Sequence, residues 1–240
     1  MGQPRTYRTL VRSGLSAYTV TVKETDLQVQ TAGDCSHLAR ELVLEHRGCL
    51  EAYIRDNPGF LPALTPWALT GPAPPIVRDM VEASAAAGVG PMAAVAGAVA
   101  ARVGQGLQAV SDQVIVENGG DIFLCTAQPA TVAVYAGRSP LSLRIGVRVD
   151  GGGQPMGICT SSGTVGHSLS FGRADAICVI SRSCALADAA ATAVGNRILT
   201  AGDMPAALAF GGTIPGVLGL LAVVGDRMAA WGAVEIVTIG

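Results

Sequence analysis

Aromatic residues make up only 4% of this 240-residue sequence, and charged residues only 14%. With so few aromatic rings, the core must be built from Ala, Val, Leu and Ile, and the 31 glycines allow backbones to approach closely. The 16 Lys and Arg residues against 18 Asp and Glu residues give a net charge of −2. A phosphate backbone is bound by a basic field that this composition lacks, so no nucleic-acid partner is expected.

Cysteine motifs for metal or redox chemistry are also missing. The closest two of the six cysteines are Cys178 and Cys184, and no Cys-x-x-Cys pair occurs. Zinc fingers and redox pairs need cysteines only about two to four residues apart. The spacing therefore predicts free, buried thiols in a reducing compartment.

Export signals and membrane spans are not expected either. The basic N-terminal segment is not followed by an apolar segment. The uncharged stretches 83–101 and 206–225 are about long enough to cross a bilayer, but each is Ala/Gly-rich and contains a proline, Pro91 or Pro215. We therefore expect a cytoplasmic protein without a membrane segment.

The sequence contains clear patterns of helices and strands. Helices are predicted between Asp34, as N-cap, and Asn57, and at residues 75–87, 92–103 and 184–199. Strands are predicted at residues 18–23, 27–30, 114–116, 122–125, 141–149, 176–181, 220–224 and 233–239. The clearest alternation is 141–149, and the last two strands are expected to pair with each other. Strands joined by turns, with helices inserted in pairs, predict an α+β fold with antiparallel or mixed sheets in one domain, 1–240.

The segment 88–97, Gly-Val-Gly-Pro-Met-Ala-Ala-Val-Ala-Gly, is the first candidate ligand site. If a helix begins near Pro91, the N–H groups of its first turn are free to bind a phosphate; these belong to Met92, Ala93 and Ala94. The segment is no P-loop, because no Gly-Lys-Ser/Thr follows. Two small-residue helices packed around a break explain the same glycines, so both interpretations stay open.

Two polar segments are candidate ligand loops. The tetrapeptide 118–121 combines two flexible glycines with polar tips, and the run 159–164 is rich in hydroxyls. Their candidate ligand-binding residues are Asn118, Gly119, Gly120, Asp121, Thr160, Ser161, Ser162, Gly163 and Thr164. His167 follows as a candidate acid or base, although a serine hydrolase is not expected without a Gly-x-Ser-x-Gly elbow. Ordinary tight turns remain the alternative for both segments.

Asp188 and Thr192 are the candidate metal ligands. They lie four residues apart on a predicted helix, so they share one face, and their neighbours there are alanines. A carboxylate and a hydroxyl so placed can bind Mg²⁺, which takes further ligands from water or a substrate phosphate. A solvated aspartate and a threonine bonded back to its own helix remain the alternative.

The order of these motifs resembles the C-terminal half of ApbE proteins. The family has a Gly-Gly turn, a Val-Gly-Ile strand, a Thr-Ser-Gly loop and an Ala-Asp-Ala-x-x-Thr helix. The corresponding segments here are 118–121, 144–147, 160–164 with His167, and 187–192. The chain is similar nearly end to end to an uncharacterised prokaryotic cytosolic family within that superfamily. The segments that carry this likeness are 24–27, 90–97, 117–121, 160–167 and Trp231-Gly.

ApbE proteins are FAD:protein FMN transferases, which split FAD and pass FMN to a threonine of an acceptor protein, with Mg²⁺ at the diphosphate. The resemblance implies that Asp188 and Thr192 bind the metal. It also implies that Gly119, Gly120, Thr160, Ser162 and Gly163 line the ligand site. The sequence departs from the family pattern at two places: no Asp-Pro follows His167, and Ala96 stands where the pattern has a lysine.

The leading hypothesis is therefore an Mg²⁺-assisted, transferase-like enzyme acting on FAD or another nucleotide-like, diphosphate-bearing small molecule. In it, Asp188 and Thr192 hold the metal and His167 transfers a proton. One alternative is a binding module that keeps the same pocket without catalysis. The other is a structural subunit that forms a homo-oligomer through its Ala/Gly-rich helices. The sequence does not identify the substrate or an acceptor protein.

Overall fold

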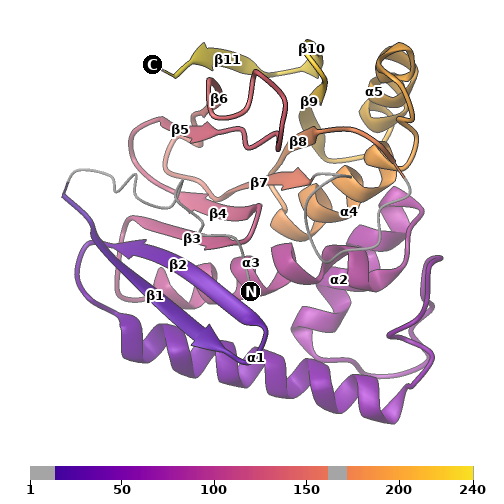
Figure 1. Ribbon diagram of the computed structural model, residues 1–240. Helices are drawn as coiled ribbons and strands as arrows, with labels where there is room; N and C mark the ends of the chain where they lie inside the picture. Colours follow the sequence, from indigo (N-terminus) through magenta and orange to yellow (C-terminus); the bar gives the residue numbers. More distant parts are fainter. Residues whose placement is uncertain (1–13, 162–171, 240) are drawn as a thin grey trace.

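The computed structural model describes residues 14–161 and 172–239 (Figure 1). The α-helices of these ranges are α1 (Ser36–Asp56), α2 (Pro75–Ala87), α3 (Val95–Leu107), α4 (Cys184–Gly195) and α5 (Met204–Gly212). The strands are β1 (Ser16–Val22), β2 (Thr25–Thr31), β3 (Val114–Asn118), β4 (Asp121–Cys125), β5 (Ala130–Ala133), β6 (Ile145–Val149), β7 (Met156–Ser161), β8 (Ala176–Ser181), β9 (Val217–Val224), β10 (Arg227–Gly232) and β11 (Glu235–Thr238).

Two antiparallel sheets organise the fold, which confirms the α+β prediction. The larger has eight strands in the order β1-β2-β3-β4-β7-β8-β9-β10, and the smaller has three in the order β11-β6-β5. Figure 1 shows the helices gathered against one side of the large sheet and the small sheet against the other. One buried apolar cluster fills the space under the helices, and a second lies between the two sheets. The chain therefore forms three layers, with the large sheet in the middle.

The first half of the chain follows the predicted pattern closely. The strands predicted at 18–23 and 27–30 form the β1–β2 hairpin, and the helix predicted at 75–87 is α2. Pro75 occupies the first turn of α2, where its missing N–H is not needed, and Gly88 ends it at φ 72°. The N-cap of α1 is Cys35, not the predicted Asp34. The Asp34 side chain still contacts the start of the helix, because its Oδ1 accepts the Ser36 N–H at 2.8 Å.

The helix expected from Pro91 begins differently. Residues Pro91–Ala94 form a short 3₁₀ helix, and the α-helix α3 starts only at Val95. Inside this turn the Ala93 N–H donates to the Gly90 carbonyl at 3.1 Å. The first free α-helical amides therefore lie further along the chain than Met92–Ala94.

The predicted strand 141–149 is wrong in its first half, because only Ile145–Val149 forms β6. Leu141 and Leu143 lie in a turn, and Leu143 adopts φ 59°. The serines of this segment bond to the backbone: Ser142 Oγ accepts the Ala136 N–H at 3.0 Å, and Ser139 Oγ accepts the Leu141 N–H at 3.1 Å. These side chains offer the backbone partners that compete with a strand ladder.

Three further boundaries differ from the sequence-based prediction. The partner of β9 is β10, Arg227–Gly232, whereas Glu235–Thr238 pairs with β6 in the small sheet. The helix predicted to reach residue 199 ends at Gly195. The hydroxyl-rich segment 159–161, expected as a loop, is the end of strand β7 and pairs with β8.

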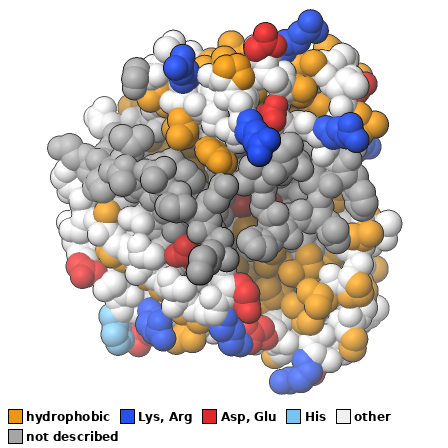
Figure 2. All heavy atoms as spheres, viewed as in Figure 1, with side chains coloured by type: hydrophobic (Ala, Val, Ile, Leu, Met, Phe, Trp, Pro, Cys, Tyr) orange, Lys and Arg blue, Asp and Glu red, His pale blue; other side chains and the backbone are white. Residues whose placement is uncertain are grey.

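Among the described residues, no single helix is long and apolar enough to cross a membrane. Pro75–Ala87 and Pro91–Leu107 pass such a test only as a pair, and the two are bent by 105° at the break. Figure 2 shows basic and acidic side chains interspersed over the visible face, and its described part carries no continuous basic area.

Candidate functional site

The candidate site lies where α3 and α4 cross above strands β4 and β7. Helix α4 begins at a capped end, since Ser183 Oγ accepts the Leu186 N–H at 3.2 Å. All residues of α4 are buried except Asp188 and Thr192, which are partly exposed and lie one turn apart. The two predicted metal ligands therefore share the one face of this helix that is not closed by packing.

Gly97 permits the close crossing of the two helices. A Cβ atom at this position would overlap the Cys184 carbonyl oxygen and approach the Asp188 Cβ to 3.0 Å. Only glycine lets the first turn of α3 lie directly against α4 at this point. The crossing brings the amide end of α3 to the Asp188 carboxylate.

The Asp188 carboxylate is held by the backbone of α3. Its Oδ2 accepts the Gly97 N–H at 3.0 Å, and the Ala96 backbone also bonds to it. The free amides of a helix start favour an acceptor oxygen, and here a carboxyl group of the protein itself occupies them. The amides predicted to bind a phosphate, those of Met92, Ala93 and Ala94, lie in the 3₁₀ turn just before this contact, and their role stays a prediction.

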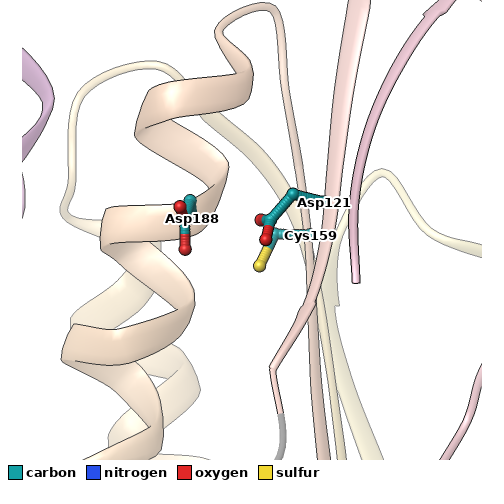
Figure 3. Close-up of side chains that lie close together, drawn as sticks. All are labelled: Asp121, Cys159 and Asp188. Carbon is teal, nitrogen blue, oxygen red and sulfur yellow. The ribbon is translucent and has the colours of Figure 1, made fainter. Parts of the chain in front are cut away.

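Asp121 and Cys159 face Asp188 from the large sheet (Figure 3). They are directly paired across β4 and β7, so their side chains leave the same face of the sheet. Asp121 is 8% exposed and Cys159 is 2% exposed, whereas Asp188 is half-buried. Ligand atoms of the three residues all lie within 4.8 Å of one another.

The electrostatics of this trio are unfavourable without a cation. Burial raises the pKa of Asp121 to about 7, although the neighbouring Cys159 thiol acts in the opposite direction. Burial, and then the charge of Asp121, raise the pKa of Asp188 well above its ordinary value, against the Gly97 and Ala96 amides. Because the two carboxyls lie close together, ionisation of Asp121 disfavours ionisation of Asp188. A bound cation would favour the charged form of both.

One oxygen of Asp121 has no role within the described part of the protein. Its Oδ1 is buried and has no hydrogen-bond partner there. Leaving a buried carboxylate oxygen unpaired costs about 1–3 kcal/mol or more, so such atoms are uncommon in native structures. This atom is the strongest local indication that the site receives a ligand.

The Gly119-Gly120 turn closes one side of the site. Asn118 Nδ2 donates to the Ala96 carbonyl at 3.1 Å, which ties the turn to the start of α3. The Thr160 N–H donates to the Gly120 carbonyl at 2.8 Å, which ties it to β7. Residues predicted from three separate motifs are thus brought together with Asp188.

The remaining predicted site residues are placed as follows. Ser161 ends β7 and is half-buried, and Thr192 lies half-buried on α4. Ser162, Gly163, Thr164 and His167 lie outside the described residues, so their proposed roles stay predictions.

Sequence reasoning missed Cys159 as a member of the site. Its thiol was predicted only to be a buried apolar group, and all six cysteines are indeed free. The missing information was the pairing of β4 with β7, which places Cys159 opposite Asp121. A strand predicted over Met156–Ser161 would have placed alternate residues of this segment on one face of the sheet. With its pairing to β4 known, that face would have been the one that carries Asp121.

Solved structures of ApbE proteins have a similar fold. The Pseudomonas stutzeri flavinyl transferase ApbE aligns with a TM-score of 0.58 and 14% identity, over 90% of this chain and 94% of that one. The ApbE protein of Thermotoga maritima aligns with a TM-score of 0.56 and 13% identity, over 90% and 96% of the two chains. The chain therefore has the ApbE-like fold.

Among proteins with the ApbE-like fold, the sequence relatives identify the family to which this chain belongs. A family model described as AbpE bacteria matches residues 8–208. The UPF0280 protein of Methanocella arvoryzae is 41% identical over 212 residues, covering 88% of this chain and 86% of the relative. That of Methanoculleus marisnigri is 45% identical over 204 residues, covering 84% and 82%. The chain belongs to this ApbE-like family, together with these UPF0280 proteins.

Proposed function

We propose that the protein is a divalent-cation-dependent enzyme that acts on the diphosphate of FAD or of another nucleotide-like ligand. The observation that carries the proposal is the Asp188 carboxylate, which lies on the open face of α4 and is fixed by the amides of α3. The neighbours in fold that are named flavin transferases support a flavin as the ligand.

The residues around Asp188 suit a cation. Two carboxylates lie close together, and one buried oxygen of Asp121 has no partner among the described residues. A cation such as Mg²⁺ would be held by Asp188 and Thr192, which share a helix face, and would neutralise charge on a phosphoryl oxygen. Without a cation, two carboxylates this close repel each other and also repel a phosphate.

The protein's own groups would position the ligand. The Gly97 and Ala96 backbone fixes the orientation of Asp188, so little reorganisation is needed when a ligand binds. The turn at Gly119, which adopts φ 71°, presents backbone rather than side chains at the edge of the site. Backbone of this kind suits contact with a flat ring or a phosphate.

The test measures the conversion of FAD to FMN and AMP. The reaction is run with and without Mg²⁺, and its products are separated by chromatography. We expect Mg²⁺-dependent conversion that falls by at least about 100-fold in Asp188→Asn. Asp150→Asn is the matched control, because Asp150 is exposed and its carboxylate accepts the nearby Gly152 N–H in a turn far along the chain from Asp188. Absence of both FAD conversion and FAD binding in the wild type would overturn the proposal.

A second candidate, a binding module without catalysis, is favoured by Ala96. This residue stands where the family pattern resembled by the sequence has a lysine, so a cation that could face the ligand is missing. FAD binding that quenches flavin fluorescence, without any conversion over many hours, would support the module. The same result would exclude the enzyme.

A further inference from the structure

The trio beneath α4 contains a donor that a magnesium site does not use. Cys159 Sγ lies with the carboxylate oxygens of Asp121 and Asp188 in a group whose members are all within 4.8 Å of one another. Mg²⁺ takes oxygen ligands and has little affinity for sulfur. The thiol therefore distinguishes this site from a simple Mg²⁺ site.

The position of Cys159 is not a general property of the buried cysteines. Cys184 is also buried nearby, but its Sγ donates to the Ile122 carbonyl at 3.0 Å, whereas the Cys159 thiol bonds to the Asp121 carboxyl of the trio itself. Cys178 lies on the adjacent strand β8 and belongs to the apolar cluster on the opposite face of the sheet. Cys159, in the cluster under the helices, is the thiol that faces both carboxylates.

The second observation that points to a ligand is an oxygen of Asp121 that the Cys159 thiol, which bonds to the same carboxyl, leaves unpaired. Asp121 is 92% buried, being 8% exposed, and its Oδ1 has no hydrogen-bond partner in the described ranges. Figure 3 shows its carboxylate directed from the strand toward the side of α4 that carries Asp188. A cation between the two would give this oxygen the partner that it lacks.

We propose that Asp121, Cys159 and Asp188 form a three-ligand site for Zn²⁺. Zn²⁺ is bound by thiolate and carboxylate donors, and zinc sites that act on substrates keep three protein ligands and one open position. Binding forms one Zn–S and two Zn–O bonds and releases the thiol proton, with any carboxyl proton, to solvent.

The geometry allows this coordination with small side-chain movements. Bonds of about 2.0–2.3 Å to a tetrahedral ion place its ligand atoms about 3.5 Å apart. The three donors already lie within 4.8 Å of one another, so rotations that shift them by about 1 Å or less suffice. Asp188 is the most exposed of the three residues, so a ligand would reach the ion from the Asp188 side.

This inference rests on the proposed cation site at Asp188, but it replaces Thr192 by Asp121 and Cys159 as the other ligands and names Zn²⁺ as the preferred ion. It does not depend on flavin being the substrate. The fourth position of the ion would be available to water or to a phosphoryl oxygen of the ligand.

The experiment uses the full chain, stripped of metal with a chelator and then titrated with Co²⁺, which replaces Zn²⁺ in tetrahedral sites and absorbs visible light. We expect a sulfur-to-cobalt charge-transfer band in the near ultraviolet that Zn²⁺ abolishes by displacement. The band should be lost in Cys159→Ser and kept in Cys178→Ser, the matched buried thiol on the other face of the sheet.

Zinc affinity, measured by competition with a chromophoric chelator, is the second readout. Loss of an outer-shell partner alone lowers metal affinity about 10- to 100-fold, so we expect Cys159→Ser to lower Zn²⁺ affinity by more than about 10-fold. Thermal denaturation of each variant without metal establishes that it is folded. The wild-type spectrum tests the inference even if Cys159→Ser is unfolded.

The outcomes separate this inference from the proposed function. Binding of Co²⁺ without a thiolate band overturns the zinc site, while FAD conversion with Mg²⁺ would still support the enzyme. A thiolate band without FAD conversion supports the zinc site and counts against the flavin chemistry. No tight binding of Co²⁺ or Zn²⁺ overturns the zinc site outright.

Discussion

Replacing Asp121 with asparagine should remove a pH-dependent cost of folding. In the unfolded chain this carboxyl has its ordinary pKa of 3.8. In the folded protein, burial raises the pKa to about 7. Between these values the folded state keeps a proton that the unfolded state has lost. Stability should therefore fall as the pH rises through this range, and the cost should be complete above about pH 7.

The size of the effect follows from the two values. A tenfold change in proton affinity is worth about 1.4 kcal/mol, so a pKa raised from 3.8 to about 7 costs about 4 kcal/mol at alkaline pH. About 3 kcal/mol of this cost develops between pH 5 and pH 8. Asparagine has nearly the same shape and no charge, so Asp121→Asn should lose the part of the pH dependence that comes from Asp121, while Asp188, whose pKa is also raised, keeps its own contribution. It should also be more stable than wild type at pH 8.

The assay is urea unfolding of both proteins at pH 5 and pH 8, with a chelator present so that no cation occupies the site. The free energy of unfolding is extrapolated to zero urea at each pH. Asp150→Asn, at an exposed turn, serves as control and should follow the wild-type pH dependence. If Asp121→Asn destabilises the protein equally at both pH values, the carboxyl is not held neutral by burial, and the electrostatic account of the site is wrong.

Three other variants test how the site and its surroundings are packed. Gly97→Ala forces a Cβ into the Cys184 carbonyl and should lower the free energy of unfolding by about 1–3 kcal/mol. Its control, Gly48→Ala, adds a Cβ where the space is open, and should be neutral or stabilising. Urea unfolding measures both variants. Phe60→Ala removes a fully buried ring that packs edge-on against two other rings, and should cost about 3–5 kcal/mol by the same measurement. Ser181→Ala removes the hydroxyl that accepts the Ser183 N–H and donates to the Gly216 carbonyl, and should lower the midpoint of thermal unfolding, at a cost of about 1–3 kcal/mol.

Local sequence signals were sufficient to predict the elements whose ends are marked by proline or glycine. Helix α2 could be predicted to the residue because Pro75 starts it and Gly88 ends it. The β3–β4 hairpin could be predicted because apolar runs flank a pair of glycines. The segment before β6 shows the limit of periodicity, since Leu141 and Leu143 alternate like a strand while serine side chains hold the backbone in a turn.

The candidate site could be predicted only in part, because its members meet through long-range pairing. The shared face of Asp188 and Thr192 follows from helical spacing alone. That Asp121 and Cys159 lie opposite each other depends on the pairing of β4 with β7, strands separated by β5 and β6 in the chain. No local pattern encodes which strands become neighbours, so the thiol was not recognised as part of the site.

The small sheet has a consequence for how the chain folds as it is synthesised. Its central strand β6 takes β11 as one neighbour, and all of β7 to β10 must leave the ribosome before β11 does. Until then one hydrogen-bonding edge of β6 is unprotected, and such edges recruit strands from other chains. Aggregation during translation should therefore begin at Ile145–Val149, and a nascent chain stalled just before Glu235 should be the species most dependent on chaperones.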